Sequence, residues 1–326
     1  MRQNRQGSLV SFRPDIRLVD CTMRDGGLVN NFGFTDEFVK RLYEANLAAG
    51  VDYMEFGYKA STAVFDPTKF GKWKFCREED IRRIVGDNDT DMKIAVMADV
   101  GRTDYKKDIL PAQDSVIDMV RVATYINTIP AAIAMLEDAK EKGYETTVNV
   151  MAISKVGGDE LEGSLELLAS SSVDVIYLVD SFGAFYPEQI ERLMDKYLNI
   201  AAKYNKKIGV HAHNNQQLAF ANTIEALSLG ASYLDATVCG MGRGAGNCYM
   251  ELLLSFLRNP KYDKVPLMDF IQQDMLKMKQ EAVWGYDLPY MLTGIMNAHP
   301  SSAIQFMKEG RTDYSAYYHQ LMEEGF

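Results

Sequence analysis

The sequence lacks any run of about 18 apolar residues, the length that a membrane-spanning helix needs. It also lacks an excess of basic residues. With 35 Lys and Arg against 45 Asp and Glu, its formal charge is -10, which disfavours nucleic acid and anionic membranes as partners. The four cysteines form no CxxC pair, and residues 1–15 contain no apolar signal core. We therefore expect a cytoplasmic protein with reduced thiols, no nucleic-acid partner and no membrane partner.

The main pattern in the sequence is an alternation of two kinds of segment. Eight short apolar runs rich in β-branched residues recur along the chain, and stretches with helical periodicity separate most of them. The runs are Ile16–Thr22, Val51–Gly57, Lys93–Ala98, Val116–Ala123, Glu145–Ala152, Val175–Asp180, Lys207–His213 and Tyr233–Val238. Strands joined through helices pair in parallel, and eight of them close a barrel. This predicts an α/β fold, a (β/α)8 TIM barrel; a doubly wound open sheet, the alternative, usually has fewer strands.

The alternation stops near Asn259, and the remaining residues have a helical pattern. No Gly/Ser-rich linker separates them from the preceding segment. We therefore expect a barrel domain over residues 1–258 and a helical C-terminal extension over residues 259–326, packed near the barrel mouth.

Candidate metal ligands follow the first, seventh and eighth predicted strands, which become neighbours when a barrel closes. His211 and His213 stand two residues apart on a strand, so their rings point to the same side. Two such histidines can be a simple polar pair, but neutral imidazole is a common metal ligand. Asp25 can complete the set or cap a turn, and Asn247 can join it or cap a helix. Mixed nitrogen and oxygen ligands favour Mn2+ or Mg2+ over Zn2+.

A glycine-rich segment, Gly240–Asn247, follows the last predicted strand. Gly240, Gly242 and Ala245 fit the loose pattern G-x-G-x-x-A, but a dinucleotide site needs a further strand and helix after it. The pattern therefore disfavours nicotinamide binding. Two readings remain: the glycines let the backbone approach a metal and its substrate, or they bind phosphate.

Three motifs occur in a characteristic order: Asp20-x-Thr22-x-Arg24-Asp25-Gly26, His211-x-His213-Asn214 and Gly242-x-Gly244-x-Gly246-Asn247. Together they resemble the DRE-TIM metallolyases, the metal-dependent barrel family of 4-hydroxy-2-oxovalerate aldolase, isopropylmalate synthase and hydroxymethylglutaryl-CoA lyase. The resemblance covers about residues 14–258. Further segments resemble the aldolase branch, namely Val120–Thr124, Asp180–Ala184 and Ala221-Asn222-x-Ile224.

The resemblance implies a role for twelve individual residues. The implied metal ligands are Asp25, His211, His213 and Asn247. The implied catalytic residues are Arg24, Glu55, Tyr286 and Tyr290. The implied substrate-binding residues are Thr22, Arg121, Ser181 and Gly242. Among the catalytic residues, the arginine would stabilise an enolate and one of the two tyrosines would supply a hydroxyl; Arg24 could instead only form a salt bridge with Asp25 or Glu55.

One departure from the aldolase pattern concerns proton transfer. The aldolases have a histidine base shortly after their Arg-Asp-Gly, whereas residues 27–31 here contain none. Another group must then move the proton, and the candidates are Tyr290, Tyr286, Glu55 or a water molecule on the metal.

The expected function is that of a metal-dependent carbon–carbon lyase or aldolase. It would act through the enolate of pyruvate or a related 2-oxo acid and an aldehyde. A Claisen-type acyl-CoA condensing enzyme or lyase is one alternative, and a catalytically silent barrel that serves as a scaffold is another. Resemblance to the aldolase branch adds two further partners to consider, a second copy of the chain and an aldehyde dehydrogenase.

Overall fold

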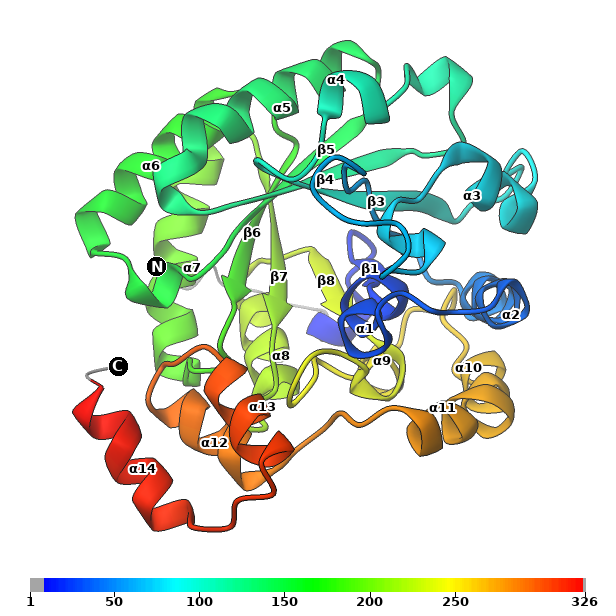
Figure 1. The fold of residues 1–326 in the computed structure, drawn as a ribbon. Coiled ribbons are helices and arrows are strands. Elements are labelled where there is room, and N and C mark those ends of the chain that lie inside the picture. Colours follow the sequence, from blue (N-terminus) through cyan, green and yellow to red (C-terminus); the bar gives the residue numbers. More distant parts are fainter. Residues whose placement is uncertain (1–8, 325–326) are drawn as a thin grey trace.

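The computed structural model describes residues 9–324, and its centre is a closed barrel of eight parallel strands. Each strand pairs with the next in sequence, and β8 pairs with β1 to close the ring (Figure 1). The strands are β1 (Arg17–Asp20), β2 (Tyr53–Tyr58), β3 (Lys93–Asp99), β4 (Met119–Thr124), β5 (Glu145–Val150), β6 (Val175–Asp180), β7 (Lys207–Ala212) and β8 (Tyr233–Ala236). The predicted (β/α)8 barrel and the place of all eight strands are confirmed.

Helices follow the strands and surround the barrel. They are α1 (Thr22–Asn30), α2 (Asp36–Ala48), α3 (Glu78–Val85), α4 (Tyr105–Asp108), α5 (Ile129–Glu141), α6 (Gly158–Ser170), α7 (Pro187–Lys203), α8 (Ala219–Leu229) and α9 (Met250–Phe256). Local sequence sets several of their ends. Thr35 caps α2 by accepting a hydrogen bond from the amide of Phe38 at 3.2 Å, and α5 and α7 carry a proline in their first turn. No helix within residues 9–324 is long and apolar enough to cross a membrane.

Helix α1 begins only two residues after β1 and carries Arg24 and Asp25 in its first turn. Its two glycines stand where no side chain fits. A Cβ atom on Gly26 would lie 2.8 Å from the Met241 sulfur, and one on Gly27 would lie 2.2 Å from the Phe32 ring. The glycines therefore let α1 lie directly against the loop after β8, at the barrel mouth.

The C-terminal extension is helical, as predicted. It contains α10 (Val265–Phe270), a π-helical turn η7 (Ile271–Met275), α11 (Leu276–Glu281), α12 (Leu288–Ile295), α13 (Ser301–Lys308) and α14 (Tyr314–Glu323). Figure 1 shows it passing from α10 and α11, beside α2, to α12–α14 at the lower left.

The extension contacts the barrel at separate places. Phe270 of α10 packs against Phe38 of α2 with ring centroids 5.2 Å apart. Trp284 donates a hydrogen bond to the carbonyl of Cys239 at 3.0 Å, and Asn215 donates one to the carbonyl of Tyr290 at 3.2 Å. Cys239 and Asn215 both follow barrel strands, so these contacts hold the extension against the mouth. The division at residue 258 stays a prediction.

Candidate active site

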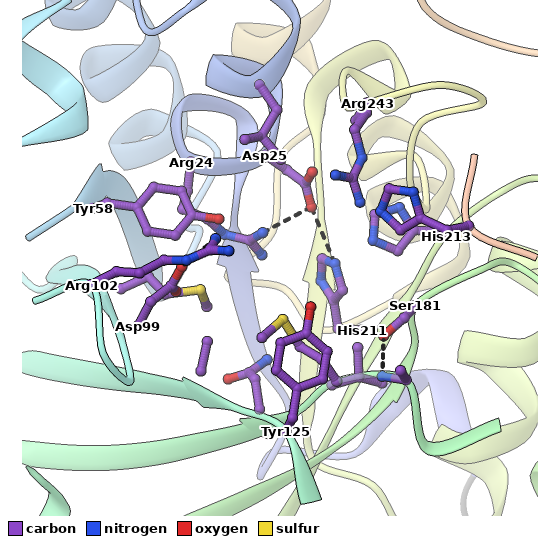
Figure 2. Close-up of a pocket in the computed structure, with 18 of the residues that line it drawn as sticks. Arg24, Asp25, Tyr58, Asp99, Arg102, Tyr125, Ser181, His211, His213 and Arg243 are labelled. Carbon is purple, nitrogen blue, oxygen red and sulfur yellow. Dashed lines mark hydrogen bonds and ion pairs between the residues drawn. The ribbon is translucent and has the colours of Figure 1, made fainter. Parts of the chain in front are cut away.

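A cavity of about 270 Å³ opens at the carboxyl ends of the strands, where barrels of this kind place their sites. Figure 2 shows side chains from α1, from β7 and from the loop after β8 gathered on its walls. Asp25, His211 and His213 all line it, and so does Arg24. The barrel therefore brings together residues that lie almost 190 positions apart in the sequence.

Asp25, His211 and His213 form one cluster of potential metal ligands. Each offers a ligand atom, and these atoms all lie within 4.8 Å of one another. The Oδ2 atom of Asp25 lies 3.2 Å from Nε2 of His211, and the two imidazole rings lie 5.1 Å apart. Asn247 pairs with His213 through the backbone, as an isolated antiparallel bridge. Helix α9 is capped by Tyr249, so Asn247 does not serve as its N-cap.

The cluster fits a divalent ion because several of its buried polar atoms have no hydrogen-bond partner. These atoms are Oδ1 of Asp25 and Nε2 of His211; Oδ1 of Asn247, whose backbone pairs with that of His213, also has no partner. A buried polar atom without a partner costs free energy, which a bound cation would offset. Oxygen and imidazole ligands with room left for substrate oxygens are typical of Mn2+ and Mg2+ centres.

The charges of the site also suit a cation. Burial alone would raise the pKa of Asp25, but Arg24 and the two histidines hold that pKa well below its usual range. Burial lowers the pKa of His213 to about 3, so its imidazole is neutral and able to bind a metal. Burial would also lower the pKa of His211, but the nearby carboxylates of Asp235 and Asp25 raise it. The Nε2 atom of His211 faces Asp25, and a metal would bind this atom in place of a proton.

Six side chains at the bottom of the site form a closed ring of polar contacts. Arg24 lies 2.9 Å from Glu55 and 3.0 Å from Asp25. Arg121 lies 2.9 Å from the same Glu55 oxygen and 2.5 Å from Asp235. Asp235 contacts Nδ1 of His211, and Nε2 of His211 returns to Asp25. The ring members are Asp25, Arg24, Glu55, Arg121, Asp235 and His211.

Arg24 forms salt bridges with both Asp25 and Glu55, the structural role that the sequence analysis gave as the alternative to enolate stabilisation. These contacts use its Nε and Nη1 atoms. Among residues 9–324, Nη2 has no partner, and the side chain still lines the cavity. The salt bridges fix the guanidinium and leave one nitrogen available to a ligand.

The predicted substrate-binding residues lie in different places. Ser181 lines the cavity, and its hydroxyl accepts a hydrogen bond from the amide of Ala152 at 2.9 Å. Thr22 and Arg121 are fully buried below the cavity. Gly242 adjoins the Asn247 side chain, because a Cβ atom there would lie 2.2 Å from Nδ2 of Asn247. Of the four, the structure brings only Ser181 to the cavity wall.

Three of the predicted catalytic residues, Glu55, Tyr286 and Tyr290, lie outside the cavity lining. Glu55 is fully buried, and one of its oxygens binds the two arginines of the ring. Tyr290 packs against Ala245 and Ala303, beside Gly244, whereas Tyr286 is 51% exposed. Their catalytic roles stay predictions.

Several cavity residues were not among the sequence candidates. They are Tyr58, Lys74, Asp99, Arg102, Tyr125, Asn149, Arg243 and His299. Tyr58 and Asp99 end β2 and β3, so the position of a polar residue at a strand end could have indicated them. Lys74 lies in an irregular segment and His299 in the extension, where no strand pattern points to them.

The fold and this cluster define a (β/α)8-barrel with the ligand set of a divalent-metal enzyme. Residues 15–273 match the HMGL-like family model, and the chain belongs to the HMGL-like family.

Relatives in this family carry two kinds of name. Over 242 residues the chain is 31% identical to a 4-hydroxy-2-oxovalerate aldolase of Geobacillus genomosp. 3, covering 74% of this chain and 70% of that protein. Over 267 residues it is 29% identical to an oxaloacetate decarboxylase of Mycobacterium tuberculosis, covering 79% and 76%. The solved N-terminal domain of a candidate aldolase from Bacteroides vulgatus superposes with a TM-score of 0.79 at 30% identity, covering 90% of this chain and 96% of that one. These relatives indicate an enzyme of the DRE-TIM lyase kind.

Proposed function

We propose that the protein is a divalent-metal-dependent aldolase that joins the enolate of pyruvate, or of a related 2-oxo acid, to an aldehyde, or catalyses the reverse cleavage. The observation that carries this proposal is the convergence of Asp25, His211 and His213 on one cavity wall beside Arg24. The names of the aldolase relatives support the reaction class.

Asp25, His211 and His213 would hold the metal, with Asn247 as a fourth ligand, and Mn2+ or Mg2+ fits these donors better than Zn2+. Such an ion supplies Lewis acidity toward a substrate carbonyl. Asp235 orients the His211 ring by its contact with Nδ1 at 2.9 Å, which leaves Nε2 facing the cluster.

Arg24 places a fixed positive charge where the enolate oxygen develops. Two carboxylates hold its guanidinium at Nε and Nη1, so the free Nη2 needs no reorientation during the reaction. A preorganised donor of this kind contributes roughly 3–4 kcal/mol to transition-state stabilisation in other enzymes.

His299 is the cavity residue best suited to move a proton. Its Nδ1 accepts the amide of Ser301 at 3.2 Å, so the proton of the neutral ring is on Nε2 and can be donated to an enolate carbon. Burial and the nearby Arg243 lower the pKa of His299, which favours the neutral ring at physiological pH. Tyr58 and Tyr125 are the phenols that line the same cavity.

Decarboxylation of a 2-oxo diacid is a second candidate. In oxaloacetate the bond between C3 and the C4 carboxylate breaks, carbon dioxide leaves, and the electron pair forms the same pyruvate enolate. The enolate then takes a proton at C3. No base has to remove a carbon-bound proton, which agrees with the absence of histidine from residues 27–31 and with the name of one relative.

Exchange of the pyruvate methyl protons in D2O tests the aldolase proposal without knowledge of the aldehyde. NMR should show exchange that depends on added Mn2+ or Mg2+ and falls by about 100- to 1,000-fold in Arg24→Ala, the loss typical of a missing donor to a developing charge. His299→Ala and Tyr290→Phe should separate the proton-transfer candidates, because only the true one lowers exchange while metal content is unchanged.

A wild type that binds metal and pyruvate but exchanges no protons would refute the aldolase proposal. Release of carbon dioxide from oxaloacetate would then favour the decarboxylase, and thiol release from acetyl-CoA would favour a Claisen-type condensing enzyme. A protein that binds no metal at all would favour the scaffold.

A further inference from the structure

Lys74 is a buried cation that the metal site and the enolate chemistry leave unused. It ends the short helical turn η2 (Lys72–Lys74), which follows β2, and it is only 6% exposed. Its side chain lines the cavity. Among residues 9–324 its ammonium has no hydrogen-bond acceptor and no carboxylate at ion-pair distance. A charge withdrawn from water without a partner is costly, so its retention calls for an explanation.

Aromatic rings surround this ammonium. Its nitrogen lies 4.2 Å from the centroid of Tyr58 and 4.3 Å from that of Phe65. It lies 5.0 Å from the Phe32 ring and 5.9 Å from the Phe70 ring. The rings stabilise the positive charge through their faces but accept no proton from it and supply no counter-charge. A methionine would fill such surroundings without the cost of burying a charge, so packing alone does not account for a lysine.

The backbone holds Lys74 in this position. The amide of Ala60 donates to the carbonyl of Lys74 at 3.2 Å, and the amide of Gly71 donates to the carbonyl of Asn31 at 2.8 Å. A Cβ atom at Gly71 would lie 1.9 Å from the carbonyl oxygen of Phe32. The segment after β2 is thus fastened to the end of α1, and the ammonium is presented to the cavity from a fixed support.

The neighbouring charges leave this side of the cavity positive. Asp99 is the nearby carboxylate, and Arg102 also attracts it, with 3.7 Å between their charged atoms. Lys74 and Arg102 together outweigh Asp99 by one charge. Figure 2 shows Tyr58, Asp99 and Arg102 on one side of the cavity and His213 and Arg243 on the other. Arg102, and Asp99 near Lys74, therefore lie across the cavity from His213.

We propose that Lys74, assisted by Arg102, binds an acidic group on the second substrate, so that the aldehyde carries a carboxylate or a phosphate. The proposal rests on the proposed aldolase function and adds the chemical class of the acceptor. The 2-oxo acid occupies the side of the cavity with Asp25 and the histidines. The acidic group of the acceptor forms an ion pair with the Lys74 ammonium on the opposite side. Burial lowers the pKa of Lys74 to about 8, which still leaves most of the side chain charged at pH 7.

Acceptor selectivity tests this proposal directly. With pyruvate as donor, succinic semialdehyde and glyceraldehyde 3-phosphate are compared with the neutral aldehydes butanal and glyceraldehyde. We expect the wild type to prefer at least one acidic acceptor in kcat/KM. Lys74→Met should raise KM for that acceptor by between about ten- and a hundredfold, the range for a hydrogen bond to a charged group, and leave the neutral acceptors unaffected. Lys74→Arg should keep most of the preference.

Lys72→Met is the matched control. Lys72 belongs to the same helical turn, but it pairs with Asp36 and lies outside the cavity lining. This variant should keep the wild-type preference. Comparison of succinic semialdehyde with glyceraldehyde 3-phosphate shows whether the site binds a carboxylate or a phosphate.

A binding measurement keeps the proposal testable when turnover is weak. Calorimetry with 4-hydroxybutyrate, compared with butane-1,4-diol, should show binding of the acid to the wild type and a loss in Lys74→Met. Equal affinity for both probes, or a wild-type preference for neutral aldehydes, would overturn the proposal. So would slower pyruvate exchange in Lys74→Met, because Lys74 would then act on the 2-oxo acid. Normal exchange without acidic preference refutes only this inference, whereas absent exchange refutes the proposed function itself.

Discussion

Asp235 contacts His211 through its Oδ2 atom, 2.9 Å from Nδ1 of the imidazole. Burial would raise the pKa of Asp235, but Arg121 and His211 lower it to about 2, so the carboxylate is charged and accepts the Nδ1 proton. The other ring nitrogen, Nε2, then has its lone pair directed toward Asp25. An aspartate outside the cavity lining thus determines which nitrogen of His211, a proposed metal ligand, is available.

Asp235→Asn should therefore weaken metal binding. A change in the group that orients a ligating histidine typically costs about 10–100-fold in affinity, and we expect a loss of that size for Mn2+ measured by calorimetry. Asp118→Asn is the control, since Asp118 bonds the amide of Ile94 at the other end of the barrel. Unchanged Mn2+ affinity in Asp235→Asn would show that His211 is not a ligand.

The metal content itself should respond to His213. Elemental analysis of protein purified without chelator should give about one divalent ion per chain, the stoichiometry of a single centre with three protein ligands. His213→Ala should lose the ion with little change in Tm, because this side chain lines the cavity and does not belong to the hydrophobic core. His299→Ala should keep it. A His213→Ala protein with full metal content would remove this residue from the site.

Arg121 should matter for stability. It is fully buried, pairs with Glu55 and Asp235, and stacks on Tyr177 at 4.6 Å. Arg121→Met removes one of the two partners of each of two buried carboxylates, and breaking a buried pair costs about 3–5 kcal/mol. Urea denaturation should show this loss. Lys93→Met, which breaks an exposed pair with Glu145, should cost less than about 1 kcal/mol. Equal losses in the two variants would contradict the assignment.

Removal of the extension should disable the site. Truncation after Arg258 deletes His299 from the cavity wall and uncovers the surfaces beneath Trp284 and Phe270. We expect lost pyruvate exchange and increased binding of a hydrophobic dye. A shorter truncation after Gly310 removes α14 but keeps His299, and it should retain exchange. A soluble, active protein ending at Arg258 would show that the extension is dispensable.

Acceptor use should fall at alkaline pH if Lys74 binds an acidic group. A lysine loses its charge as the pH rises through its pKa, and burial brings the pKa of Lys74 down from its usual 10.5 to about 8. For an acidic aldehyde, 1/KM should therefore be at its maximum below pH 7 and decline as the pH rises through about 8. For a neutral aldehyde, 1/KM should not change over this range. The charged groups that face the same ammonium are Asp99 and Arg102. In Lys74→Arg the decline should disappear, since arginine stays protonated. A decline that persists in this variant would assign the titration to another group.

The barrel could be predicted from the sequence because several strands, such as β6, are nearly continuous apolar runs, and such runs reflect burial on both faces. The ligand cluster could be predicted because strand neighbours in a closed barrel follow from their order alone. His211 and His213 needed only the two-residue periodicity of a strand to share a wall.

Other parts of the site could not be predicted in this way. The place of Lys74 depends on how an irregular segment after β2 folds against α1, and no periodicity encodes that contact. The resemblance to the aldolase branch implied that Arg121 binds substrate. Its side chain is instead fully buried in pairs with Glu55 and Asp235, outside the cavity lining. The position of Tyr290 depends on how the extension packs against the barrel, which involves a tertiary contact with Asn215.

The ring of six polar side chains below the cavity has a consequence for protein engineering. Its members come from α1, β2, β4, β7 and β8, and each one is the partner of two others. Grafting only Asp25, His211 and His213 into another barrel would leave Asp25 without Arg24 and His211 without Asp235. A successful transplant must carry the six residues together, including Arg24 of α1 and Arg121 of β4. For the same reason, descendants of this barrel can acquire new acceptors by changing the wall that holds Lys74 and Arg102, because neither residue belongs to the ring.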